Sequence, residues 1–383
     1  MSNRWPAGII RKNPVTPAGP YQNGAASGVW SLADAAYWTK QGLWPIAGNE
    51  RPQFIAVSHS NLPLVSAYPW SGSGFGAKFA DAATPPAGSG TALGVTFSPS
   101  GNTIAVAHNV TPFISAYPWS GSGFGVKFAN PSTLPTSASN GIAFSPSGNA
   151  IAVANDATPF VTAYPWSVSG FGTKFANPAT LPLDDGGLGV AFSPAGNAIA
   201  VTSFSPPCVS VYPWSGSGFG VKFANPATLP AGASWGVTFS PSGNAIAVAH
   251  DSSPFVSVYP WSGSGFGAKF ANPATPPTGT GYSVAFSPAG DAIAVAHGTT
   301  PFISAYPWSG SGFGTKFANP ATLPTGTGRG VSFNPSGNAI AVAHGTTPFI
   351  SAYPWSGSGF GVKFANPATL STGNSFGVAF TQL

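Results

Sequence analysis

The chain has 383 residues, of which 43% are apolar and only 5% are charged, and its formal net charge is +5 at neutral pH. Glycine (50) and proline (41) interrupt every apolar run before the roughly 18 residues that a membrane-spanning helix needs, which argues against membrane insertion. Seven of the 13 basic residues are single lysines spaced evenly along the chain, so there is no basic patch that would favour nucleic-acid binding.

Residues 1–50 differ from the rest of the chain and are predicted to form an N-terminal extension with one helix. Ser31 is placed to cap a helix over residues 32–41, with Asp34 in its positive first turn. The aromatic residues in and beside this segment are more than so short a helix buries alone. We therefore expect them to anchor the extension by packing on the rest of the chain or on a partner; they are Trp30, Tyr37, Trp38 and Trp44.

Residues 51–383 consist of one unit repeated with small changes. Its most regular marker, Tyr-Pro-Trp-Ser, occurs seven times at intervals of 47 to 49 residues. Each unit contains four short segments with strand-like alternation, which in the last full copy span residues 330–333, 339–344, 349–353 and 362–365. A period of this length filled with short strands predicts a β-propeller with one four-stranded blade per repeat.

The two ends of the repeat region predict how the ring closes. The first copy begins with a second-type strand at residues 54–59, whereas the chain ends with an unmatched inner-type strand at residues 377–380. The C-terminal strand should therefore complete the first blade and leave no free sheet edge at the seam. The predicted fold is an all-β, seven-bladed propeller over residues 51–383.

The inner hairpin of each repeat resembles that of WD40 and YVTN-type propeller repeats. The resemblance lies in Phe-Ser-Pro-Ser-Gly at residues 97–101 and in its counterparts at 144–148, 192–196, 239–243 and 286–290. It implies the propeller fold and nothing specific about activity.

A second resemblance lies in the N-terminal extension. The segment Gly-Val-Trp-Ser-Leu-Ala-Asp at residues 28–34, followed by Tyr37-Trp38 and by Gly-Leu-Trp-Pro at 42–45, is similar to a short segment of tailed-phage virion proteins. The resemblance implies a virion component that joins other virion proteins through residues 1–50.

The polar residues suggest no reaction centre. The eight carboxylates are scattered, and only Asp184 and Asp185 are adjacent. Five histidines end the second strand of their blades, too far apart to share a metal ion, and a structural hydrogen bond is the favoured role for them. We predict no catalytic residue, no metal and no cofactor.

The repeats differ most where each inner strand begins. The seven copies have six kinds of side chain at that position. Since inner strands line the channel of a propeller, these side chains should ring one of its mouths. Three aromatic residues, an arginine and an amide in an otherwise uncharged rim are typical of a recognition site. The candidate ligand-facing residues are Asn140, Trp235, Tyr282, Arg329 and Phe376.

These observations favour a non-enzymatic structural or binding protein of a tailed-phage virion, in the host-adsorption apparatus or decorating the particle. It would be made in the host cytoplasm and would face a host-surface glycan or protein. The first alternative is a lectin-like carbohydrate-binding propeller, for which the repeated tryptophans could also serve. The second is a lactonase-like enzyme.

Overall fold

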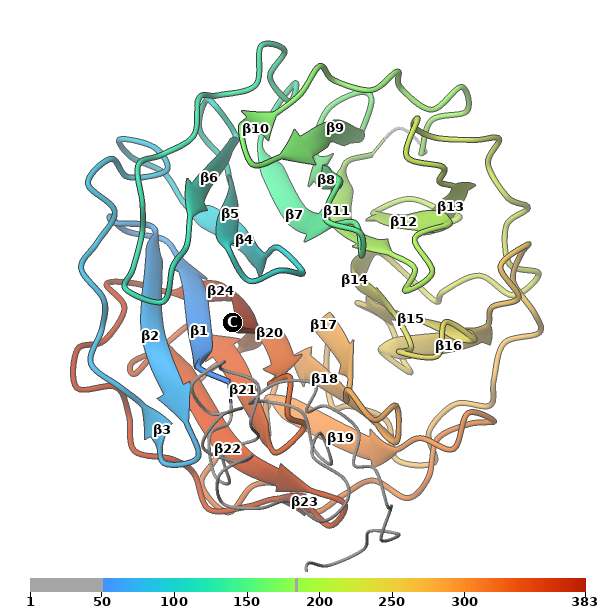
Figure 1. The fold of residues 1–383 in the computed structure, drawn as a ribbon. Coiled ribbons are helices and arrows are strands. Elements are labelled where there is room, and N and C mark those ends of the chain that lie inside the picture. The colour runs from blue at the N-terminus through green and yellow to red at the C-terminus, as the bar shows by residue number, and fades with distance from the viewer. Residues whose placement is uncertain (1–50, 183–184) are drawn as a thin grey trace, which may run out of the picture. The chain divides into compact units, whose positions relative to one another are not determined.

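The computed structural model describes residues 51–182 and 185–383, which form seven antiparallel sheets arranged as blades around a central channel (Figure 1). The prediction of an all-β propeller is confirmed. The predicted helix over residues 32–41 and the four aromatic residues expected to anchor the extension lie outside the described residues. Within the part of the chain that the structure describes, no helix is long and apolar enough to cross a membrane.

Each blade has the same order of strands from the channel outward. The innermost strands are β24 (Ser375–Gln382), β4 (Ala92–Phe97), β7 (Ser139–Phe144), β11 (Gly187–Phe192), β14 (Ser234–Phe239), β17 (Gly281–Phe286) and β20 (Gly328–Phe333). The second strands are β1 (Gln53–His59), β5 (Thr103–His108), β8 (Ala150–Asn155), β12 (Ala198–Ser203), β15 (Ala245–His250), β18 (Ala292–His297) and β21 (Ala339–His344). The third strands are β2 (Val65–Ser71), β6 (Ile114–Pro118), β9 (Val161–Ser167), β13 (Val209–Pro213), β16 (Val256–Pro260), β19 (Ile303–Pro307) and β22 (Ile350–Ser356).

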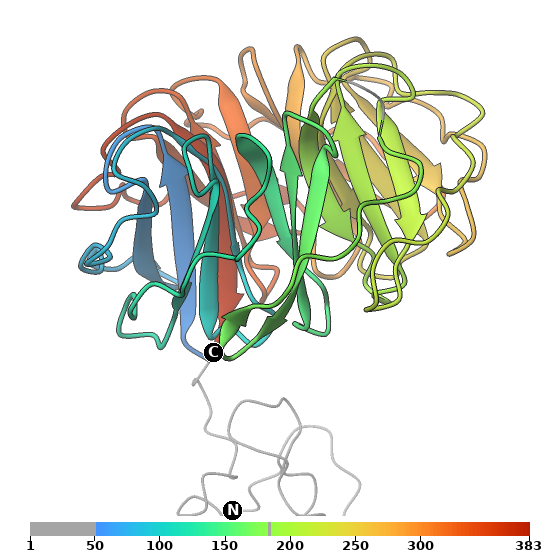
Figure 2. The ribbon, with the colours of Figure 1, turned by 90° about the horizontal axis from the view of Figure 1, so that it is seen from above.

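The ring closes as the sequence predicts. The sheet order of the first blade is β24-β1-β2-β3, so the C-terminal strand supplies its innermost position. We number the blades from this one, so that the seventh begins with β20. Figure 2 shows the strands running between two faces. We call the face at which the inner strands begin the upper face, and the face with the C-terminus the lower face.

The fourth strand is shorter than predicted and lies earlier in the sequence. Only three blades have one, namely β3 (Gly74–Phe75), β10 (Gly170–Phe171) and β23 (Gly359–Phe360), and the other four keep a single bridge such as Trp214 to Phe219. The lysine that was expected on this strand follows it in a loop. There it is half-buried, and in most blades it donates to the side chain three residues later, as Lys222 does to Asn225. These lysines therefore make local structural hydrogen bonds.

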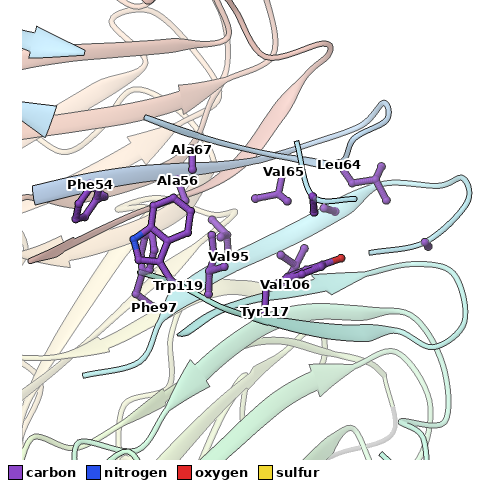
Figure 3. Packing of buried hydrophobic residues seen from close by; sticks show 14 residues of the cluster. Phe54, Ala56, Leu64, Val65, Ala67, Val95, Phe97, Val106, Tyr117 and Trp119 are labelled. Atoms are coloured by element: carbon purple, nitrogen blue, oxygen red, sulfur yellow. The ribbon is translucent and has the colours of Figure 1, made fainter. Parts of the chain in front are cut away.

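The core lies between neighbouring blades, where small residues of one sheet receive large residues of the next. Between the third and fourth blades, the alanines of β8 pack against Ile199 and Val201 of β12, and all of these side chains are buried. Figure 3 shows the corresponding contact between the first and second blades, where Ala56 and Ala67 lie near Val95, Val106 and Trp119. This large-to-small pairing brings the sheets close together, as dense packing of a core requires.

The Tyr-Pro-Trp-Ser marker is conserved between the copies because both of its aromatic rings are buried there. Trp214 lies with its ring centroid 5.2 Å from each of Phe175, Phe192 and Phe219 in edge-to-face contact. Phe175 belongs to the preceding blade, so the tryptophan joins two blades. In five of the seven blades the tyrosine of the marker also donates to a backbone carbonyl of the connection to the inner strand, as Tyr164 does to Thr133 at 2.8 Å.

The inner strands approach each other so closely that six of the seven have glycine as their third residue. A Cβ on Gly141 would lie 2.9 Å from the carbonyl oxygen of Leu188 and 3.0 Å from the Cα of Gly189 in the next blade. Ser283 occupies this position in the sixth blade, and its hydroxyl accepts a hydrogen bond at 3.3 Å from the backbone N–H of Val331. These seven residues form a collar around the channel below its upper mouth.

Substitution of a collar glycine should destabilise the ring. We expect Gly141→Ala to lower the free energy of unfolding by about 1–3 kcal/mol, because the added methyl group meets backbone atoms that cannot move without separating two blades. Gly72→Ala is the matched control, since its Cβ would meet no atom within 4 Å. Urea denaturation followed by tryptophan fluorescence measures both; equal midpoints for the two variants would contradict the close approach.

Candidate functional site

A β-bulge sits at the start of six inner strands and turns one side chain out of the ladder. In the second blade Ala92 pairs with His108 and Gly94 pairs with Ala107, which leaves Leu93 as the extra residue. The same register shift occurs in the third to seventh blades. Bulges at the rims of closed sheets re-aim side chains in this way. The bulged residues are those at which the repeats differ most.

The bulged residues meet at the upper mouth of the channel. They line one cavity of about 190 Å³ together with the residues that follow them in each inner strand. This volume is below the 300–1,000 Å³ that is typical of sites for drug-sized ligands, so it suits a small ligand. All five residues predicted to face a ligand are brought together there, and Leu93 and Leu188 complete the ring. That they bind a ligand remains a prediction.

Arg329 supplies a cation to this cavity. Its guanidinium carbon lies 4.5 Å from the centroid of the Phe376 ring, and its Nε is buried with no hydrogen-bond partner. Within residues 51–182 and 185–383, the one ion pair joins Lys78 and Asp81, so Arg329 forms none there. Gly345 lies beside its Nε, and a larger residue at that place would compete with the arginine for space. The guanidinium is therefore placed to meet an anionic or strongly polar ligand group.

A second set of residues lies at the rim and was not predicted from the sequence. They follow the second strand of each blade directly and lie beside the bulged residue. In the third blade Asn140 Nδ2 donates to the Asp156 carboxylate at 2.5 Å, which holds that exposed carboxylate beside the cavity. In the sixth blade this position is Gly298, and the Tyr282 ring lies over it. The signal was available, because this position also varies between repeats while the histidine before it mostly does not.

The rim also carries a row of aromatic rings. Phe204, which directly follows β12, has its centroid 5.3 Å from that of Trp235, and Trp235 lies 5.3 Å from Tyr282. Trp235 is half-buried, whereas the seven tryptophans of the repeated marker are only 2–8% exposed. The marker tryptophans therefore join blades and offer no face to a sugar, which leaves Trp235 as the tryptophan of the rim within the described residues.

The histidines make the structural hydrogen bonds that were predicted. His108 Nε2 lies 3.1 Å from the hydroxyl of Ser115 on the third strand, and the other four histidines have the same partner type. Asn155 and Thr162 form the equivalent bond in the third blade. Burial lowers the pKa of each histidine to about 4, so all five are neutral at pH 7. No three His, Cys, Asp or Glu residues gather to hold a metal ion in the described part of the chain.

No protein-family model matches the chain, and no curated protein matches it. Among solved structures, it is similar to a candidate 6-phosphogluconolactonase of Bacteroides uniformis, at 15% identity and a TM-score of 0.67, over 87% of this chain and 100% of that one. A candidate 6-phosphogluconolactonase of Bacteroides fragilis has 11% identity and a TM-score of 0.68, over 88% and 100% of the two chains. The periplasmic gluconolactonase of Pseudomonas aeruginosa has 13% identity and a TM-score of 0.63, over 86% and 99%.

The likeness is one of fold, and the chain shares the β-propeller architecture of these proteins. It contradicts two predictions from the sequence, namely that the chain is a structural virion protein of a tailed phage and that it is not an enzyme. The propellers that it resembles bear the names of lactonases. The predictions were wrong because they depended on a short N-terminal resemblance and on the scattering of carboxylates along the sequence, whereas the fold brings Asp156 beside the channel mouth.

The buried histidines should make the protein sensitive to acid. Each is neutral in the folded state with a pKa near 4, whereas the unfolded chain has the ordinary value of 6.5, so unfolding takes up protons below pH 6.5. The stability that they contribute is present above pH 6.5 and is lost as the pH falls towards 4, by about 3 kcal/mol for each histidine.

A variant with His250→Asn and Ser257→Thr, which copies the pair of the third blade, tests this point. Its free energy of unfolding should fall less than that of the wild type between pH 7 and pH 4.5, as measured by urea denaturation. The same pH dependence in both proteins would show that His250 does not titrate on unfolding.

Proposed function

We propose that this chain is a lactonase-like propeller that binds a small sugar lactone at its upper channel mouth and hydrolyses it. The observation that carries the proposal is the ring of bulged residues around one cavity, with the Arg329 guanidinium in it and the Asp156 carboxylate beside it. The names of the similar solved structures support the same class of substrate.

Hydrolysis of a lactone needs a proton acceptor for water and a stabiliser for the negative charge on the carbonyl oxygen. Asp156 is assigned the first role, since Asn140 donates to its carboxylate and holds it at the mouth. Arg329 is assigned the second role. It belongs to the seventh blade and Asp156 to the third, so the two groups approach the cavity from different sides.

The step balances with water as the second reactant. Asp156 takes one proton from a water molecule as the water oxygen bonds to the lactone carbonyl carbon, and the carbonyl electron pair moves to oxygen near Arg329. The tetrahedral intermediate then re-forms the carbonyl and breaks the bond to the ring oxygen. The ring oxygen receives the proton and becomes a hydroxyl group, which leaves an open-chain hydroxy acid.

The aromatic rim residues would position the sugar and not take part in the reaction. Trp235 and Tyr282 present ring surface beside the cavity, and such rings favour the apolar C–H face of a sugar. These residues also favour a second candidate function, which is carbohydrate binding without turnover. The two functions share a site and differ only in whether the bound molecule is converted.

Lactone hydrolysis measured in a pH-stat tests the proposal. The wild type should hydrolyse glucono-δ-lactone or its 6-phosphate faster than buffer alone. Arg329→Ala and Asp156→Asn should each lower the catalysed rate about a hundredfold, within the range that one acid–base or electrostatic group contributes.

Lys222→Ala is the matched control for Arg329→Ala, because it removes the same charge at a residue that does not line the cavity, and it should leave the rate unchanged. Melting temperatures of all variants show whether they are folded. A wild-type rate no higher than that of buffer would rule out the enzyme, and binding of gluconate under the same conditions would then favour the carbohydrate-binding alternative.

A further inference from the structure

Phe204 has a place in the fold that the proposed reaction does not explain. It directly follows β12 in the fourth blade, where the other blades have Ser60, Asn109, Asp156, Asp251, Gly298 and Gly345. Its side chain is 36% exposed, so a large apolar ring meets solvent at this position. It does not line the channel cavity. A large ring has thus replaced a small or polar residue on the upper face, beside the residues that line the mouth.

The position of this ring is fixed by its surroundings. Gly186, at a φ of +75°, lies below the Phe204 ring, since a Cβ there would come 3.5 Å from it. The Phe204 backbone is tied on both sides, with its N–H 3.4 Å from the carbonyl oxygen of Asp185 and its carbonyl 3.8 Å from the Cys208 Sγ. Side contact with Trp235 in an edge-to-face arrangement completes the packing. Part of the ring remains exposed to solvent.

Phe204, Trp235 and Tyr282 form one row across the fourth, fifth and sixth blades, with successive centroids 5.3 Å apart. Trp235 and Tyr282 line the cavity, so the row leads outward from it. Hydrogen-bond acceptors flank the row. Asp185 accepts from the hydroxyl of Ser205 and Asp251 from that of Ser252, each at 2.9 Å, and each carboxylate is exposed with further lone pairs to offer.

We propose that this row, with Asp185 and Asp251 beside it, is an outer subsite for a sugar ring, so that the complete ligand is a carbohydrate of two or more sugar units. A sugar matches both features, because its C–H face packs on aromatic rings and its hydroxyl groups donate to carboxylates. The two carboxylates disfavour an anionic chain such as a nucleic acid. Three rings also cover far less than the roughly 800 Å² per partner of a stable protein interface.

The outer subsite rests on the proposal that the cavity binds a carbohydrate. A change at Phe204 tests the subsite separately from the cavity, because Phe204 does not line the cavity. Phe204→Asn introduces the residue that the second blade has at the same place, Asn109, so the backbone should accept it. Val168→Gly is the matched control. It removes a 90% exposed apolar side chain from a turn of the lower face, where the other six repeats have glycine.

Calorimetry with maltotriose, cellotriose and chitotriose and with their monosaccharides tests the subsite. At least one trisaccharide should bind the wild type about tenfold or more tightly than its monosaccharide, and Phe204→Asn should abolish that difference while leaving monosaccharide affinity and lactone hydrolysis unchanged. Val168→Gly should behave as the wild type.

Equal affinity for each trisaccharide and its monosaccharide, no binding of any trisaccharide, or an unaltered preference in the folded Phe204→Asn variant would each overturn the subsite. Lactone hydrolysis by the same preparations reports separately on the cavity. If the wild type prefers a trisaccharide but does not hydrolyse the lactone, the proposed reaction is wrong and the outer subsite is still supported.

Discussion

The close approach of seven inner strands around one channel is the constraint on which the rest of the structure depends. Glycine at the collar allows backbones to come so near that a Cβ on Gly330 would lie 2.6 Å from the carbonyl oxygen of Phe376. The alternation of alanine with larger residues lets whole sheets follow that approach outward. The bulge directly before the collar places the side chain of an extra residue at the mouth, where it has room. In each bulged inner strand, the collar residue that allows close packing therefore directly follows the residue whose side chain faces the mouth.

Most of the fold could be predicted from the sequence because the same pattern of strands and turns recurs in seven copies. The period, the alternation along residues 339–344 and the unmatched C-terminal strand predict the blades and their closure. The outer strand was misplaced. The segment with Lys363 alternates like a strand, but it forms a loop in which the Phe364 N–H donates to the carbonyl of Ala352 and Lys363 donates to Asn366. A lysine with Asn or Asp three residues later recurs in every copy, but that spacing does not by itself distinguish a loop from a strand.

The site was only half accessible from the sequence. Variation among otherwise similar copies pointed to Asn140, Trp235 and Arg329, which share the cavity. Asp156 and Phe204 were missed because they stand about sixteen residues further along, and only the bulged hairpin brings them beside the mouth. The expectation of no enzyme weighed the carboxylates by their spacing along the chain, and the lactonase names of the similar propellers contradict it. Because one fold can host many reactions, the function depends on the residues at the rim.

The central claim is that the bulged residues form the ligand site of this propeller. A crystal structure of the protein soaked with gluconate, the product expected from a sugar lactone, tests it most directly. We expect density for the ligand at the upper channel mouth, with its carboxylate on the Arg329 guanidinium and its carbon chain beside Trp235 and Tyr282. Density confined to the lower face, or an upper mouth that stays free of gluconate at saturating concentration, would contradict the claim.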